Sequence, residues 1–77
     1  MKYEVHWVKA WSMCTPPYHD EHHGIFDSLE EAQASIQVWW KKNDFTPRYV
    51  RQMHDEHNNL WMDYGNHRAF YVIKEVA

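Results

Sequence analysis

Two short segments bring histidine and carboxylate side chains close together along the chain. The first, YHDEHHG at 18–24, holds three histidines and two acidic residues, and HDEH occurs at 54–57. Imidazole nitrogens and carboxylate oxygens are ligands that zinc takes in proteins, at roughly 2.0–2.2 Å. The pattern raises the hypothesis of a zinc site. Its imidazole ligands would be His19, His22, His54 and His57, with oxygen ligands from Asp20, Glu21, Asp55 or Glu56.

The alternative interpretation is that both segments are hydrated loops. Within each segment two histidines are three residues apart, a spacing that places side chains on one face only in a helix. Neither segment has a helix-forming context, and the sequence contains neither HExxH nor CxxC. Both interpretations remain open, and no cofactor other than zinc is suggested.

Signatures of catalysis are weaker than those of metal binding. Cys14 lies close enough in sequence to His19 and His22 for a thiol–imidazole pair, but a cysteine at a strand end is more often a small apolar residue. The chain has no GxSxG and no glycine-rich phosphate-binding loop. A chain with one helix also has little material for a substrate pocket of ~300 Å³ or more. We therefore expect that the protein is not an enzyme.

Secondary-structure elements must position these segments, and the hydrophobic pattern predicts them. Residues 2–11 alternate as a strand, 15–24 form a polar loop with two prolines, and 26–43 have helical periodicity. Three further strands are predicted at 47–54, 60–64 and 68–76.

The expected fold class is α+β. The order β-α-β-β-β places one helix on one face of a four-stranded mixed sheet. Because the second strand would run parallel to the first, both histidine-rich segments would lie at the same end of this sheet.

The helix is the element that the sequence defines best. Asp27 or Ser28 is expected to cap its N terminus, and Glu30 or Glu31 completes a capping box. Acidic residues at its start and lysines at its end match the helix dipole. The stripe expected to face the core consists of Leu29, Ala32, Ile36, Trp39 and Trp40.

Length and composition favour a single domain over residues 1–77. Five Trp, five Tyr and three Phe supply large side chains for a thin core. A single cysteine excludes an internal disulfide, which a small secreted domain would usually have. No segment approaches the ~20 apolar residues of a membrane span, and no signal peptide is recognisable. The expected location is the cytoplasm, with no membrane partner.

One helix covers one face of a sheet, so apolar residues on the other face need a second cover. Strand 68–76 is apolar on both faces, as in sheets that are buried on both sides. The cover is either a partner, including a second copy of the chain, or the proline-containing loop. Either of two surfaces is expected to contact a protein partner. One is the open sheet face with Trp61 and Tyr71, and the other is an acidic end with Asp20, Glu21, Asp55 and Glu56.

Nucleic-acid binding is a third alternative, which the net charge of −3 disfavours. The binding residues would be Lys41, Lys42, Arg48 and Arg51, with Trp61 or Tyr49 as stacking groups.

Two patterns carry a resemblance to a group of known proteins. The first is D-x-L-E-E-A, formed by Asp27, Leu29, Glu30, Glu31 and Ala32; the second is W-x-D-Y-G-[SN]-H, formed by Trp61, Asp63, Tyr64, Gly65, Asn66 and His67. The chain from Phe26 onward thereby resembles small uncharacterised proteins of phages and prophages of Gram-positive bacteria. Small phage proteins without catalytic motifs are frequently inhibitors of host proteins, including anti-CRISPR inhibitors of antiviral defence. The resemblance therefore implies a protein-binding module that blocks or modulates a host protein.

Overall fold

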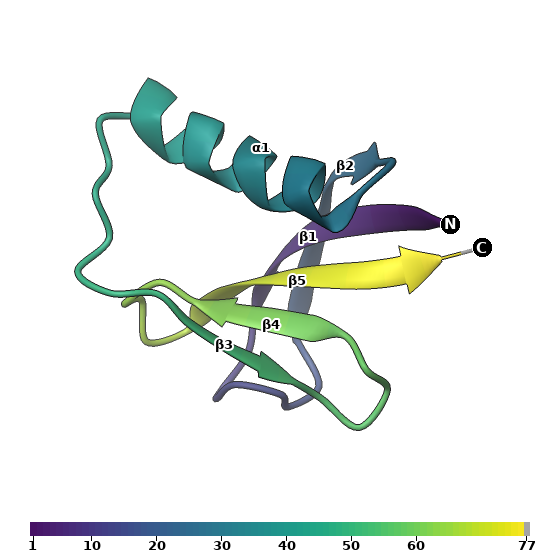
Figure 1. Cartoon of the computed structure of the whole chain (residues 1–77). Coiled ribbons are helices and arrows are strands. Elements are labelled where there is room, and N and C mark those ends of the chain that lie inside the picture. The colour runs from purple at the N-terminus through teal and green to yellow at the C-terminus, as the bar shows by residue number, and fades with distance from the viewer. Residues whose placement is uncertain (77) are drawn as a thin grey trace.

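The computed structural model describes residues 1–76, in which one helix covers one face of an antiparallel sheet (Figure 1). The strands are β1 (Lys2–Lys9), β2 (His19–Phe26), β3 (Arg51–His54), β4 (Leu60–Asp63) and β5 (Ala69–Val76), and the helix is α1 (Leu29–Lys42). The order across the sheet is β2-β1-β5-β4-β3, and all neighbours pair antiparallel. The α+β class predicted from the sequence is confirmed.

The prediction of a four-stranded mixed sheet is wrong, because residues 19–26 form the additional edge strand β2. Most side chains of β2 are exposed, so the strand lacks the apolar alternation that marks a half-buried strand in a sequence. A charged edge strand of this kind resists pairing with other chains. Its presence reverses the direction of the elements that follow, so β3 runs opposite to β1.

A β-bulge at His23 interrupts the pairing of β2 with β1. His22 lies opposite His6, and Gly24 lies opposite the adjacent residue of β1, which leaves His23 without a direct partner. A bulge of this kind changes the direction of the side chains around it. His22 therefore shares the face of His6, whereas the ring of His23 lies on the α1 side, 5.5 Å from the ring of Trp39.

α1 begins and packs largely as the sequence predicts. Ser28 is the N-cap, and its Oγ accepts a hydrogen bond of 3.1 Å from the backbone N–H of Glu31. The side chains that α1 buries are Ala32, Ile36 and Trp40. Leu29 and Trp39 belong to the predicted stripe but are exposed at its margins. Within residues 1–76, no helix is long and apolar enough to cross a membrane.

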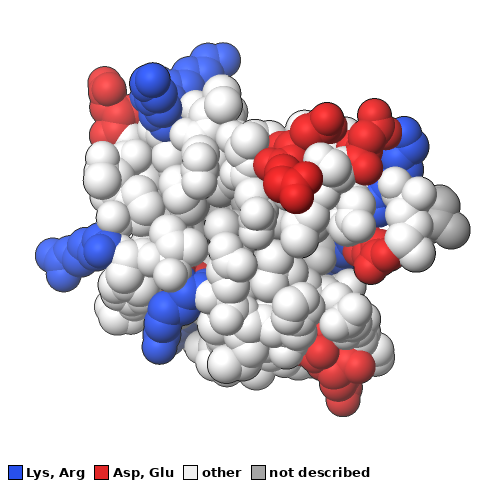
Figure 2. All heavy atoms as spheres, in the orientation of Figure 1, with Lys and Arg blue, Asp and Glu red and all other residues white. Residues whose placement is uncertain are grey.

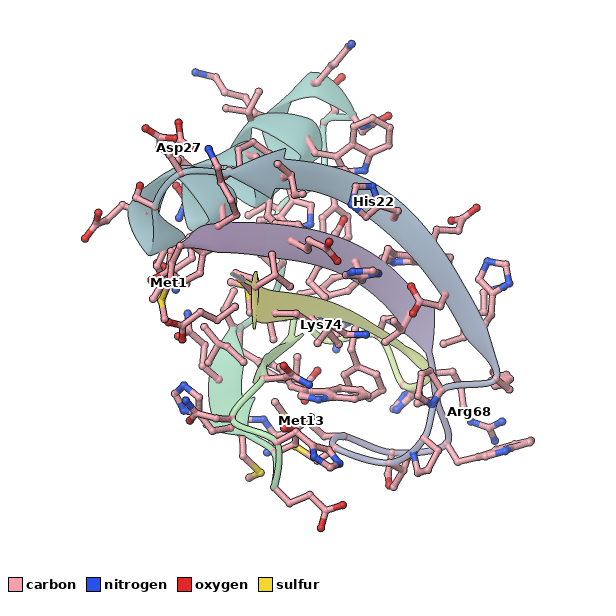
Figure 3. All side chains as sticks on the ribbon, turned by 90° about the vertical axis from the view of Figure 1, so that its right-hand side faces the viewer. Met1, Met13, His22, Asp27, Arg68 and Lys74 are labelled. Atoms are coloured by element: carbon pink, nitrogen blue, oxygen red, sulfur yellow. The ribbon has the colours of Figure 1, made fainter. Side chains whose placement is uncertain are left out.

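The face of the sheet opposite α1 is covered by the chain itself. The segment 10–18 folds against this face, and Met13 lies on the side of the sheet away from α1 (Figure 3). It packs, with Cys14, against a buried cluster consisting of Val8, Ala10, Trp61, Phe70 and Val72. A hydrogen bond of 2.9 Å from Tyr18 N–H to Lys9 O closes the segment. Of the two covers considered above, the structure shows the loop.

Candidate functional site

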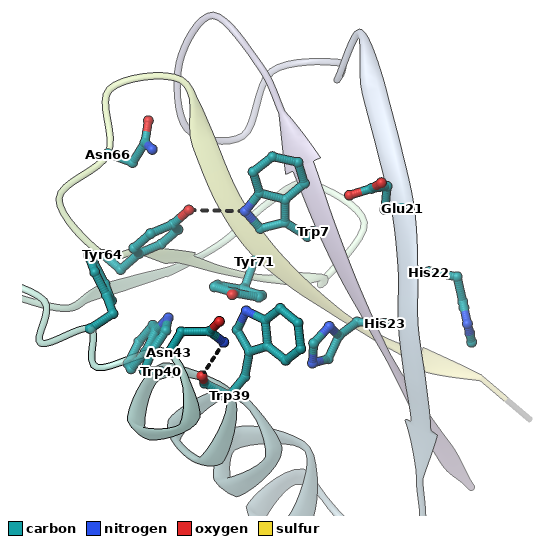
Figure 4. Close-up of a pocket in the computed structure, with 11 residues that line it drawn as sticks. Trp7, Glu21, His22, His23, Trp39, Trp40, Asn43, Tyr64, Asn66 and Tyr71 are labelled. Carbon is teal, nitrogen blue, oxygen red and sulfur yellow. Dashed lines mark hydrogen bonds between the residues drawn. The ribbon is translucent and has the colours of Figure 1, made fainter.

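A groove lined by aromatic side chains lies on the α1 side of the sheet (Figure 4). Its volume is about 880 Å³, within the range of ligand-binding sites in proteins. Its aromatic residues come from β1, α1, β5 and two connecting segments: Trp7, Trp39, Trp40, Phe45, Tyr64 and Tyr71. Its polar residues are Glu21, His22, His23, Asn43 and Asn66. These residues together form what is hereafter termed the aromatic groove.

The rings of the aromatic groove hold one another in fixed orientations. The Trp40 and Tyr71 centroids are 5.9 Å apart, and the Tyr64 and Tyr71 centroids are 5.2 Å apart. Phe45, from the segment after α1, meets Tyr64 edge to face at 5.8 Å. Separations and tilts of this size are favourable for aromatic pairs. The groove is therefore formed before any ligand arrives.

Hydrogen-bonding groups are distributed along the groove. Trp7 Nε1 donates to the Tyr64 hydroxyl at 3.0 Å, and Asn43 Nδ2 donates to the backbone oxygen of Trp39 at 2.8 Å. Among the described residues, Trp40 Nε1 makes no hydrogen bond of normal geometry, although its side chain is only 7% exposed and its N–H acts weakly on the Tyr71 hydroxyl. An unpaired buried donor costs about 1–3 kcal/mol. A ligand acceptor that reached this N–H would remove that cost.

The two tyrosines of the groove are neutral near pH 7. Burial raises the pKa of Tyr71 to about 12, with Tyr64 acting in the same direction and the Trp40 indole N–H opposing the shift. Burial also raises the pKa of Tyr64, and the hydrogen bond from Trp7 opposes this. Both hydroxyls therefore keep their protons and can donate to an acceptor in the groove.

The bulged residue His23 forms part of the groove wall at β2, together with Glu21 and His22. Its ring meets Trp39 at 5.5 Å and Tyr71 at 6.0 Å, edge to face in both cases. Burial lowers the pKa of His23, and the neighbouring His22 lowers it further. A neutral imidazole here extends the aromatic surface without adding a charge.

A second group of polar side chains lies on the opposite face, where β1 pairs with β2. Glu4 and His6 are two residues apart on β1, and His22 is the cross-strand partner of His6. One potential ligand atom from each of these three residues lies within 4.8 Å of the others. Asp20 joins them, because its Oδ1 lies 2.8 Å from His6 Nδ1. These four residues are hereafter the histidine cluster.

Hydrogen bonds and charge bind the histidine cluster together. His6 Nε2 lies 3.0 Å from Glu4 Oε1, and the side chain of His6 is only 12% exposed. The hydrogen bond with His6 lowers the pKa of Glu4, and the charges of His22 and Lys74 lower it further. Burial has a smaller effect than that hydrogen bond and raises the pKa. Figure 3 shows His22 on β2 and Lys74 on β5, the strands on either side of β1.

The predicted zinc ligands His19, His22, His54 and His57 are not brought together. β2 and β3 form opposite edges of the sheet. The turn after β3 lies at the end where β1 begins, so the expectation that both segments share one end is wrong. His19 also lies on the α1 side of β2, with its ring 6.0 Å from that of Trp7, whereas His22 lies on the other face. Only His22 belongs to the group that does converge.

The two aromatic residues predicted to share an open sheet face do not share a face. Trp61 and Tyr71 lie on opposite faces of the sheet, in separate clusters, and are 4% and 3% exposed. Trp61 is covered by the segment 10–18, and its Nε1 donates to Asp55 Oδ2 at 2.9 Å. Of the pair, Tyr71 alone lines the aromatic groove.

The four acidic residues predicted to contact a partner do not form one surface. Glu21 lines the aromatic groove, whereas Asp20, Asp55 and Glu56 line a smaller hollow of about 270 Å³ on the far side. Asp20 is held by His6 in the histidine cluster. The predicted acidic end is therefore divided between two faces.

Asp55 organises the β3–β4 turn. It accepts hydrogen bonds of 2.9 Å from the backbone N–H groups of His57 and Asn59, in addition to that from Trp61. Burial acts to raise the pKa of Asp55, but these hydrogen bonds outweigh it and the pKa is lowered. Its oxygens are engaged within the fold rather than presented to a partner.

The thiol predicted as a candidate nucleophile is placed in an apolar environment. Cys14 packs against the far-face cluster, and burial raises the pKa of its thiol, with Asp55 acting in the same direction. A thiol with a raised pKa is a poor nucleophile at neutral pH.

The basic residues proposed for nucleic-acid binding are dispersed or engaged. Arg51 donates to Asp63 through Nη2 at 2.6 Å and Nε at 3.2 Å, and the stacking group Trp61 is buried. Lys41 and Lys42 remain in the last turn of α1, with acidic residues in its first turn. Figure 2 shows these opposite charges at the two ends of the helix, with a largely uncharged surface between them. The face shown in Figure 2 therefore has no continuous basic stripe of the kind that marks a nucleic-acid interface.

No family model, no curated protein and no solved structure matches the chain. The sequence interpretation missed the aromatic groove and two members of the histidine cluster, Glu4 and His6. Their signal was present, since Glu4 and His6 are polar residues on one face of the first predicted strand. Their partner strand β2 was not recognised, so nothing indicated what they would face.

Proposed function

We propose that the chain is a non-enzymatic protein-binding module, and that it holds an extended, proline-containing segment of another protein in the aromatic groove. The observation that carries this proposal is the groove itself, in which six aromatic side chains surround about 880 Å³. Proteins bind polyproline II segments in aromatic-lined grooves of this kind. The expected ligand packs its proline rings on exposed parts of Trp39 and the neighbouring rings.

The hydrogen-bonding groups support a polyproline II ligand. A chain in this conformation makes no internal hydrogen bonds, so its carbonyl oxygens are free to accept. The hydroxyls of Tyr64 and Tyr71 carry their protons near pH 7 and supply donors for such carbonyls. Because proline already restricts the backbone, little conformational entropy is lost on binding.

The composition of the groove supports binding rather than covalent catalysis. Its described lining residues include no serine, threonine, cysteine or lysine. A hydroxyl, thiol or amine nucleophile of the serine, threonine, cysteine or lysine type is therefore not among them.

The resemblance to phage and prophage proteins extends the proposal to the identity of the partner. The target would be a protein of the bacterial host, encountered in the cytoplasm, whose working surface includes an exposed proline-containing segment. Occupation of that segment would block or modulate the target. Components of antiviral defence are one class of host protein that such an inhibitor would bind.

Selection from a displayed peptide library tests the proposal. We expect the wild-type chain to enrich peptides with proline, and Trp39→Ala to weaken binding of a selected peptide at least ~10-fold, since aromatic anchors often contribute more than 1.4 kcal/mol. Val38→Ala is the matched control. Both residues are exposed on α1, at 46% for Trp39 and 65% for Val38, but Val38 does not line the groove.

Two outcomes would contradict the proposal. One is enrichment of no peptide class, and the other is an equal loss of affinity in both variants. Sedimentation of the isolated chain addresses a second copy as the partner, because a dimer formed through the groove would dissociate in Trp39→Ala and persist in Val38→Ala.

A further inference from the structure

We propose that the histidine cluster binds a divalent transition-metal ion of the zinc class. The protein ligands are Glu4, His6 and His22, and Asp20 orients the imidazole of His6. Glu4 and His6 project from the face of the sheet opposite the aromatic groove, and the two sites share only His22, on the edge strand β2. The metal site is therefore a second binding function, distinct from the one proposed above.

The strand geometry brings the three ligands together. Glu4 and His6 occupy alternate positions of β1 and so project from the same face. His22 is paired directly with His6, and cross-strand partners have Cβ atoms about 4.5–5.5 Å apart. The bulge at His23 shifts the register between the two strands by one residue, so that His22 and not His23 pairs with His6.

The contacts of His6 provide the physical reason for a cation. Its Nδ1 lies 2.8 Å from Asp20 Oδ1 and its Nε2 lies 3.0 Å from Glu4 Oε1. A neutral imidazole has one N–H and can donate to only one of these carboxylates, so the two contacts call for either a second ring proton or a metal ion in its place. When Nδ1 donates to Asp20, the lone pair of Nε2 faces a carboxylate oxygen. A metal ion between those two atoms replaces this repulsion with two bonds to the ion.

The spacing suits a small tetrahedral ion. Two ligand atoms at about 2.0–2.1 Å from zinc lie ~3.3 Å apart in tetrahedral geometry, close to the 3.0 Å between His6 Nε2 and Glu4 Oε1. His22 is exposed, so its ring can turn toward the ion, and its potential ligand atom already lies within 4.8 Å of those of Glu4 and His6. Water would complete the coordination.

Asp20 and Lys74 act on the site without binding the ion. A carboxylate that accepts from the second nitrogen of a metal-bound histidine fixes its tautomer, and the loss of such a group typically lowers metal affinity 10–100-fold. Lys74 lies opposite Glu4 on β5, and its charge already acts on that carboxylate. Its ammonium group opposes a cation, so Lys74→Gln is expected to increase the affinity.

Calorimetric titration of tag-free, chelator-treated protein with ZnCl₂ tests the site, with MgCl₂ as the comparison. We expect about one equivalent of zinc and little magnesium, because magnesium prefers oxygen ligands. Because the ion would join β2 to β1, it should also stabilise the fold. At about 100 times the dissociation constant, a rise in the unfolding temperature of roughly 10–20 °C is expected.

Two substitutions on the same strand separate this site from nonspecific binding. His22→Ala should weaken zinc binding at least ~10-fold. His19→Ala should leave it unchanged, because His19 lies on the other face of β2. Circular dichroism establishes that both variants are folded, and Asp20→Asn provides a further variant that retains all three ligands. The proposal is overturned by binding of less than about 0.1 equivalent of zinc, or by an equal loss in His22→Ala and His19→Ala.

Discussion

Asp55 and its neighbour Glu56 have the same chemistry but different surroundings. The carboxylate of Asp55 accepts hydrogen bonds from the turn backbone and from Trp61, whereas the side chain of Glu56 is 86% exposed. From the sequence alone, Asp55 and Glu56 are two equivalent acidic residues in a polar segment. The hydrogen bonds that distinguish them depend on a tryptophan six positions away, on a strand that returns beside the turn.

Replacement of Asp55 tests this structural role. Asp55→Ala should lower the free energy of unfolding by about 2–3 kcal/mol, because the Trp61 indole and two backbone donors lose a charged acceptor. Glu56→Ala should change it by no more than ~0.5 kcal/mol. Urea denaturation followed by tryptophan fluorescence measures both values. Equal effects of the two substitutions would show that Asp55 has no special role.

Tyr71 is expected to make the fold less stable as the pH rises above about 10. An unfolded chain releases the phenolic proton near pH 10, whereas the folded chain retains it until about pH 12. Between these values the unfolded state binds fewer protons, so stability falls as the pH rises, by on the order of 2 kcal/mol. Tyr71→Phe should flatten this decrease, and the exposed Tyr18→Phe should not. Parallel wild-type and Tyr71→Phe stability curves between pH 9 and pH 12 would contradict the expectation.

At the scale of elements, the N-cap of α1 offers a direct test of local stability. Ser28→Ala removes the acceptor for the backbone N–H of Glu31 and should destabilise the protein by about 1 kcal/mol. Ser35→Ala is the matched control, since Ser35 lies inside α1 and alanine is the better helix former there. Thermal unfolding should therefore show a lower midpoint for Ser28→Ala and an equal or higher one for Ser35→Ala. A lower midpoint for Ser35→Ala than for Ser28→Ala would mean that the Ser28 side chain does not stabilise the N terminus of α1.

The difference between α1 and β2 shows how far the sequence determines this fold. α1 has its signals within one continuous segment: a cap, an apolar stripe and charges matched to the dipole. β2 has no such local signal, because an edge strand with mostly exposed side chains is held by backbone pairing to β1. The helix and three of the strands after it were therefore predictable. The five-stranded antiparallel topology was not, since a single missed strand changes every later direction.

The candidate sites were harder to predict than the elements, for a related reason. Histidine-rich segments indicated metal chemistry, but ligand sets form across paired strands, and Glu4 and His6 required the unrecognised β2 to face them. The aromatic groove combines residues from positions 7 to 71, so no local pattern contains it.

At the scale of the whole molecule, both faces of one thin sheet are covered by the same short chain. α1 covers one face and the segment 10–18 covers the other, in a molecule with a radius of gyration of 11.7 Å. Edge strands on both sides are largely exposed and polar. The chain therefore buries apolar residues of both sheet faces within its own fold.

The cover of the far face can be weakened without altering the aromatic groove. Met13→Ser removes an apolar contact with the cluster around Trp61 and should lower the free energy of unfolding by about 1–3 kcal/mol. Met53→Ser serves as the control, because Met53 is exposed on β3. Urea denaturation gives the values, and peptide binding by folded Met13→Ser should be unchanged. Full stability in Met13→Ser would mean that the segment 10–18 contributes little to the core.

The unpaired position of His23 has a genetic consequence. Loss of this one codon would join His22 to Gly24 and leave a regular ladder in which each keeps its present partner on β1. A three-nucleotide deletion would thus erase the imidazole wall beside Trp39 yet preserve the cross-strand histidine pair. A single deleted codon would therefore alter one binding surface and leave the ligand pair of the other in place.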